Sequence, residues 1–152
     1  MKRTIQALLL ILTVSLFATS CSKTARNEFA ISGRWELLKT VITTEDGKIV
    51  SETYSAQDSR RTFYNFDSNG TFTQSIISIN GTSDYTGRWV VDDDLLVMSY
   101  ADRSESYVIE ETSLLMIELS QRFTEDGKKY IRTLTLKIDT TTPREDGSDS
   151  EK

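Results

Sequence analysis

The sequence contains no histidine, one cysteine and one proline among its 152 residues. Imidazole is the side chain most often used for general acid and base catalysis and for binding zinc. Its absence excludes Ser-His-Asp and Cys-His catalytic sites and metal sites built on histidine. A single cysteine cannot form an intrachain disulfide. We therefore expect no catalytic residue, no metal ligand and no cofactor in this chain.

The one cysteine follows a segment that has the layout of an export signal. Residues 2 and 3 are basic, residues 5–17 are mostly apolar, and the small residues 18–20 precede Cys21. This order is typical of a secretory signal peptide. The apolar stretch is shorter than the about 20 residues that a membrane-spanning helix needs. We interpret residues 1–20 as a signal peptide that is removed.

The residues before Cys21 resemble the lipobox of bacterial lipoproteins, in the looser form common in Bacteroidota. The resemblance implies cleavage before Cys21 and attachment of fatty acyl chains such as palmitate to this residue. Two or three chains hold a protein on a membrane stably, because each buried methylene contributes about 0.8 kcal/mol. No acidic cluster follows Cys21, which favours the periplasmic face of the outer membrane over the cell surface. An ordinary signal peptide with an incidental cysteine is the alternative.

Charge and length limit what the remaining chain can be. Removing residues 1–20 leaves 132 residues with 16 basic and 23 acidic side chains, a net charge of −7. That length suits one domain. An acidic chain without a basic stripe is not suited to bind nucleic acid, because phosphate binding depends on clustered lysine and arginine.

The chain after the signal reads as short β-rich segments separated by turn residues. Glycine follows Asp or Asn at 46–47, 69–70, 80–81 and 126–127, where tight hairpins need a positive φ. The only proline lies outside every segment. We predict nine strands, at residues 34–43, 48–54, 61–66, 71–79, 83–91, 95–100, 105–109, 114–123 and 128–138.

Alternation indicates which face of a strand is buried. In segment 114–123 the side chains of Leu115, Ile117 and Leu119 share one face, and in segment 128–138 those of residues 130, 132, 134, 136 and 138 do. In segment 34–43 the pattern is ambiguous, because Lys39 falls on the face of Trp35.

A meander of eight or nine strands with no helix to cover it is stable when its edges are paired. A barrel achieves this by closing on itself. We predict an all-β fold, a small antiparallel up-and-down β-barrel, with a two-sheet β-sandwich as the alternative. The predicted organisation is a signal peptide at 1–20, a lipidated polar tether at 21–31, the barrel at 32–139 and a disordered acidic tail at 140–152.

Three short motifs recur in the predicted barrel. They are Gly33-Arg34-Trp35, the Phe-Asp-Ser-Asn-Gly-Thr-Phe run at residues 66–72, and Thr-Gly-Arg-Trp at residues 86–89 ahead of Leu-Leu-Val-Met at 95–98. Together they resemble the lipocalin-like domain of Bacteroidota lipoproteins, a reduced calycin barrel. The resemblance covers most of the chain after the signal. By analogy with lipocalins it implies binding of a small hydrophobic ligand.

The predicted barrel and the resemblance assign two groups of residues to the barrel plug and to the ligand wall. Gly33 and Trp35 are predicted to plug one end of the barrel, and the resemblance implies that Arg132 stacks on the plug tryptophan. The alternative for Arg132 is a side chain that reaches out at the rim. The predicted ligand wall is Phe72, Tyr85, Trp89 and Tyr107.

Two other functions are consistent with the sequence. A filled barrel could use its outer surface to dock another protein of the cell envelope, and would then expose an apolar patch. A glycoside hydrolase could work with carboxylate pairs such as Glu110 with Glu111 or Glu125 with Asp126. These acids lie at strand ends or turns among polar neighbours, so we expect no enzyme.

Two further acidic or polar motifs have simple explanations. Asp67-x-Asn69 and residues 92–94 resemble parts of calcium loops, but no closing glutamate follows, and we interpret both as turns. Residues 139–141, Asp-Thr-Thr, resemble an O-glycosylation site of Bacteroidota.

Overall fold

The computed structural model describes residues 23–55 and 59–141. The predicted signal peptide, Cys21 and residues 142–152 of the predicted tail lie outside the described residues. One helix and nine strands follow each other along the chain: α2 (Lys23–Ile31), β1 (Gly33–Thr44), β2 (Ile49–Tyr54), β3 (Arg61–Phe66), β4 (Thr71–Ser78), β5 (Gly81–Asp92), β6 (Leu95–Ser99), β7 (Ser104–Thr112), β8 (Met116–Glu125) and β9 (Lys128–Ile138). No helix in the described part of the chain has the length and apolar character needed to cross a membrane.

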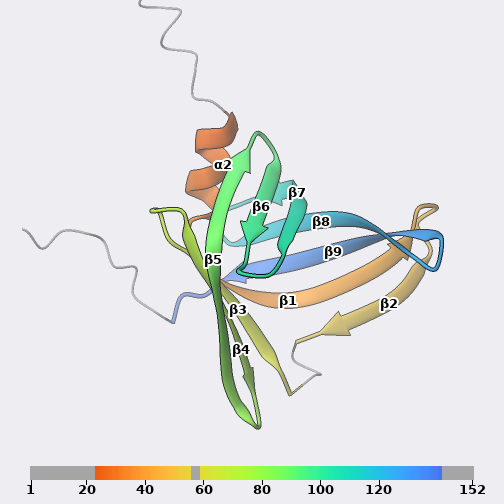
Figure 1. Ribbon diagram of the computed structural model, residues 1–152, viewed down its shortest axis with the longest axis horizontal. Coiled ribbons are helices and arrows are strands. Elements are labelled where there is room, and N and C mark those ends of the chain that lie inside the picture. The colour runs from red at the N-terminus through yellow and green to blue at the C-terminus, as the bar shows by residue number, and fades with distance from the viewer. Residues whose placement is uncertain (1–22, 56–58, 142–152) are drawn as a thin grey trace, which may run out of the picture.

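Eight of the strands close into an antiparallel barrel. From β3 to β9 each strand pairs with the next, and β1 pairs with both β3 and β9, which closes the sheet. β2 is an additional strand that pairs with the later half of β1. Figure 1 shows β1, β2, β8 and β9 extending together as a long ribbon beyond the rest of the barrel. The predicted antiparallel barrel of eight or nine strands is confirmed, and the sandwich alternative is wrong.

A β-bulge in β1 explains why its alternation was ambiguous. The pairing of β1 with β9 shifts between Leu37 and Lys39, which leaves Leu38 as the extra residue. Before the bulge Trp35 and Leu37 face inward. After it the inward face passes to Thr40 and Ile42, which pair with the inward residues Leu134 and Arg132. Lys39 therefore faces outward, where it forms an ion pair with Glu52 of β2.

The barrel has a closed end, where β1 begins and β9 ends, and an open end at the opposite tips of these strands. Apolar side chains fill the closed half: Ile31, Trp35, Phe66, Phe72, Trp89, Val91, Leu96, Met98, Ile109, Ile117, Leu119, Leu134 and Leu136 are all buried. The predicted inward faces of β8 and β9 are confirmed at Ile117, Leu119, Leu134 and Leu136. Leu115 differs, because it precedes β8 and is exposed in the turn.

The helix α2 covers the closed end, where the sequence predicted a polar tether. Its residues Asn27 and Ile31 are one turn apart and are both buried. The Asn27 side chain donates to the backbone oxygen of Asp93 at 2.7 Å, and the Trp35 indole donates to the backbone oxygen of Ile31 at 2.7 Å. Thus residues 23–31 pack onto the barrel, and the tether prediction is wrong for them.

Candidate ligand site at the open end of the barrel

The inward face of the barrel changes from apolar to polar one pleat beyond the filled half. Since side chains two residues apart on a strand share a face, each polar residue can be matched with a core residue beside it. On the inner face, the next residue toward the open end is Tyr64 after Phe66 and Gln74 after Phe72. It is Gln121 after Leu119 and Arg132 after Leu134. Tyr64 pairs with Gln74, and Gln121 pairs with Arg132, so these side chains meet on neighbouring strands. We name as the open-end cluster the residues Tyr64, Gln74, Tyr100, Glu105, Tyr107, Gln121 and Arg132.

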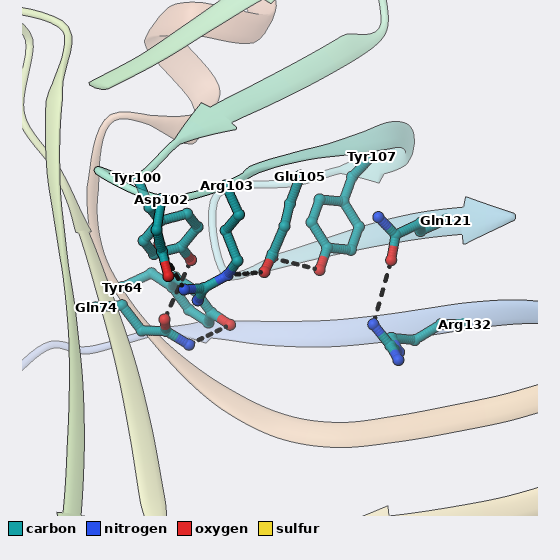
Figure 2. A network of polar contacts seen from close by, with 9 residues as sticks. All are labelled: Tyr64, Gln74, Tyr100, Asp102, Arg103, Glu105, Tyr107, Gln121 and Arg132. Carbon is teal, nitrogen blue, oxygen red and sulfur yellow. Dashed lines mark hydrogen bonds and ion pairs between the residues drawn. The ribbon is translucent and has the colours of Figure 1, made fainter. Parts of the chain in front are cut away.

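Hydrogen bonds link most members of the open-end cluster (Figure 2). The Gln74 amide donates to the Tyr64 hydroxyl at 3.1 Å and accepts from the Tyr100 hydroxyl at 3.1 Å. The Tyr107 hydroxyl donates to Glu105 at 3.1 Å. On the rim, Arg103 donates to the other oxygen of Glu105 at 3.0 Å and lies 3.9 Å from the ring centroid of Tyr100. The polar groups are thus held in place by one another across β3, β4, β7 and the turn after β6.

The three tyrosines of the open-end cluster are neutral hydroxyl groups. Burial raises the pKa of Tyr64, and the neighbouring Tyr107 and Glu105 raise it further. Burial is also the main cause of the raised pKa of Tyr100 and of Tyr107, followed in each case by the charge of Glu105. A phenol in this condition stays protonated. Tyr100 and Tyr107 donate their protons within the cluster, so among these three it is Tyr64, whose oxygen accepts from Gln74, that can donate to a ligand.

Arg132 is a cation on the inner wall of the barrel. Its guanidinium donates to the Gln121 side-chain oxygen at 3.2 Å and lies 5.0 Å from the ring centroid of Phe123. Among the described residues no Asp or Glu forms an ion pair with it. Its charge acts on the buried phenols, since it lowers the pKa of Tyr64 and of Tyr107 against the larger effect of burial. An inward cation of this kind can attract an acidic group.

The predicted ligand wall is divided between the two halves of the barrel. Phe72 and Trp89 lie in the filled half, where both pack against Phe66. Tyr107 is buried and belongs to the open-end cluster. Tyr85 pairs with Gln74 and is 43% exposed, so it faces the open end with room beside it. Two of the four predicted wall residues therefore reach the open half.

Gly33 and Trp35 of the predicted plug lie at the closed end of the barrel, but Arg132 does not. Gly33 adopts a φ of 129°, and Trp35 is buried beneath α2. The strand pairing sets Arg132 opposite Ile42, seven residues along β1 from Trp35. Along β9 the separation is six residues, from Arg132 to Ile138 opposite Trp35, or about 20 Å at about 3.3 Å per residue. Arg132 therefore does not stack on Trp35, and the ring it covers is Phe123.

The sequence also missed five members of the open-end cluster: Tyr64, Gln74, Tyr100, Glu105 and Gln121. The signal that could have found them is a polar residue on the core-facing parity of a strand, as at Gln74 beyond Phe72. To recognise the cluster from this signal, the pairing register of several strands has to be known at once.

Two hollows share Ser59 in their linings. One of about 430 Å³ opens between β4, β5 and the start of β3, and includes Ile76, Ser83 and Tyr85. One of about 570 Å³ lies on the outer wall between β1, β2 and β3, and includes Glu36, Lys39 and Arg61. Neither hollow is lined by a member of the open-end cluster, so we assign the site to the cluster and to neither hollow.

The acidic motifs act as turns. The Asn69 side chain accepts from the backbone of Thr71 at 2.9 Å, and Asp94 forms an ion pair with Lys23 of α2 at 2.9 Å. Among the described residues no three Asp, Glu or Cys side chains come together as a metal site.

Comparison with known proteins adds a family and several solved structures. A model of the lipocalin-like domain matches residues 19–116. An uncharacterized protein from Bacteroides eggerthii is similar at 17% identity and a TM-score of 0.43, over 67% of this chain and 97% of that one. Lobster apocrustacyanin A1 is similar at 14% identity and a TM-score of 0.48, over 79% and 67%. Bovine odorant binding protein, solved with a selenium-containing odorant, is similar at 16% identity and a TM-score of 0.44, over 76% of each chain. Among curated proteins none is similar enough to match.

Proposed function

The chain belongs to the lipocalin-like domain family, and we propose that it binds a small hydrophobic molecule with an acidic group at the open end of its barrel. We further propose that acyl chains on Cys21 hold it at the cell envelope, on the periplasmic face of the outer membrane. The binding role is in keeping with the family, whose members are typically binding proteins and not enzymes.

The observation that carries the binding proposal is Arg132 on the inner wall, which forms no ion pair with any residue that the structure describes. A charged side chain turned into a barrel is costly unless something compensates for its charge. Among the described residues Gln121 supplies one hydrogen bond and Phe123 one ring, and most of the five guanidinium donors have no partner there. A carboxylate, sulfonate or phosphate on a ligand would complete the site.

Aromatic side chains beside Arg132 can receive the apolar part of such a ligand. Phe123 and Tyr130 stack with ring centroids 5.5 Å apart, next to Arg132 on β8 and β9. The closed half is filled with apolar side chains, so a ligand has to lie in the open half. This arrangement fits a small amphipathic molecule better than a long chain that needs a deep cavity.

The test is binding of 1-anilinonaphthalene-8-sulfonate, a fluorescent probe with an apolar ring system and one sulfonate. We expect Arg132→Gln to weaken binding about tenfold, because a charge-assisted hydrogen bond contributes about 1.5–3 kcal/mol. Lys137→Gln is the matched control: it removes the same charge from the same strand, on the exposed outer face.

Arg132→Lys should retain most of the affinity, because it keeps the charge. Thermal melting of each variant shows whether it is folded. Equal affinity of Arg132→Gln and Lys137→Gln, or no binding of the probe to the folded wild type, would contradict the proposal.

Docking of a second envelope protein is the other candidate function. It is favoured by an apolar patch on the outer face of β5, β6 and β7, where Val90, Leu95 and Val108 are exposed. Val90 pairs with Val97, and Leu95 pairs with Val108, so the patch is continuous across the three strands. Native mass spectrometry of the protein extracted from its own cells separates the two functions, by a retained small molecule or a retained protein.

A further inference from the structure

The turn between β7 and β8 has an unusual surface. Leu114 and Leu115 of the turn and Met116, the first residue of β8, are 87%, 63% and 47% exposed. Turns are normally polar, and the other described hairpin turns carry Asp, Asn, Gly or Arg with at most one large apolar residue. Three consecutive large apolar side chains in solvent call for a partner. We name residues 114–116 the apolar tip.

The apolar tip is held in one conformation. The Ser113 hydroxyl accepts from the backbone nitrogen of Met116 at 3.0 Å, and the Ser113 nitrogen donates to the Met116 oxygen at 2.8 Å. The Leu115 oxygen accepts from the backbone nitrogen of Ile138 at 2.9 Å. The tip is therefore a fixed projection of the barrel, and an environment that buries it need not order it first.

The apolar tip lies at the closed end, which is also the end where the chain enters the fold. Ile138, which bonds the tip, pairs with Trp35, and β1 follows directly after α2. The tip is thus two strand spacings, about 10 Å, from the start of β1. A second exposed apolar residue, Phe29, lies on the outward face of α2 at the same end.

The length of chain before α2 limits how far this end can be from an anchor at Cys21. Lys23 is two residues after Cys21, and two residues span at most about 7 Å. The helix itself has nine residues, about 13 Å in length. An acylated Cys21 would therefore keep the closed end of the barrel close to the membrane surface and leave the open end facing away.

We propose that the apolar tip inserts among the lipids of the membrane that carries the Cys21 acyl chains, so that the closed end faces the bilayer. The inference rests on the lipid anchor proposed above. Asp67, Asp93 and Asp94 occupy neighbouring turns of the closed end, so insertion depends on apolar contact and not on attraction to anionic lipids. The orientation leaves the open-end cluster accessible from the aqueous side.

The test places a fluorophore at two matched positions of the full acylated protein. Leu114 and Ile79 are each 87% exposed, at the closed and the open end respectively. Cys21 is the only natural cysteine and is blocked by acylation, so Leu114→Cys and Ile79→Cys can be labelled selectively with nitrobenzoxadiazole. The two proteins are reconstituted into phosphatidylcholine vesicles with and without spin-labelled lipid.

We expect the label at 114 to shift to shorter wavelength and to be quenched by the spin-labelled lipid, while the label at 79 does neither. If both labels report water on vesicle-bound protein, the inference is wrong and the anchor stands. A shift at 114 without quenching by lipid would place a protein or a second copy on the tip, and would also overturn it. If the intact mass shows Cys21 without acyl chains, the anchor itself fails, and this inference fails with it.

Discussion

Gly87 is the residue whose small size the barrel needs most directly. A Cβ at this position would lie 2.2 Å from the backbone oxygen of Ser99 and 2.7 Å from Cε1 of Phe72. The first neighbour is backbone of the adjacent strand and cannot move aside without breaking the pairing of β5 with β6. The Thr-Gly-Arg-Trp motif therefore has a packing reason for its glycine that does not depend on any ligand.

We predict that Gly87→Ala lowers the free energy of unfolding by about 3 kcal/mol, at the upper end of the usual cost of overpacking. For a domain of this size the melting temperature should fall by more than about 10 °C. Thr86→Ala, at the exposed neighbouring position, should change the stability by less than about 0.5 kcal/mol. Similar melting curves for the two variants would show that Ser99 and Phe72 are not as close as described.

At the residue scale the sequence predicted which side chains face inward better than it predicted which residues they contact. Arg132 was predicted on the core-facing parity, and it does face inward. Its stacking partner was wrong, because the choice between Trp35 and Phe123 depends on the register of β1 with β9 and on the bulge at Leu38. Phe72 and Trp89 were predicted as wall residues because parity alone does not tell how far along the barrel the filled half extends.

The helix α2 is the element that the sequence did not predict. It buries only Asn27 and Ile31, and the described helix has no acidic residue in its first turn and no basic residue in its last. Such a short helix is not stable alone in water, so its stability comes from contact with the barrel. The nine strands, by contrast, were predicted within a few residues at each end. Glycines mark four of the hairpin turns, at residues 47, 70, 81 and 127. Asp126 and Gly127, for example, both have positive φ in the turn between β8 and β9.

We predict that α2 is detached from the barrel in a larger fraction of molecules in Asn27→Ala than in Arg26→Ala. Arg26 is the exposed neighbouring position. Losing the 2.7 Å bond to Asp93 leaves a carbonyl without its partner and should cost about 1–3 kcal/mol. Hydrogen exchange at residues 23–31 should then be about tenfold faster, with little change in the strands. Equal exchange in both variants would mean that the other contacts of α2, the burial of Ile31 and the ion pair of Lys23 with Asp94, are sufficient to hold the helix.

At the scale of the whole molecule, the barrel combines a filled closed half with a polar and aromatic open half. The family and the barrel were predicted from the three motifs and from the need to pair every sheet edge, and both are confirmed. The division of the lumen could not be predicted, because it depends on how all eight strands are staggered. It leaves the polar and aromatic half as the part of the barrel where we propose that a ligand binds.

The most direct test of this account is to map the binding of 1-anilinonaphthalene-8-sulfonate by NMR on isotope-labelled protein. We predict that chemical-shift changes concentrate at Tyr64, Gln121 and Arg132, and that Trp35 and Leu136 in the closed half are unchanged. Changes confined to the outer patch at Val90 and Val108, or to the closed half, would contradict a ligand site at the open end.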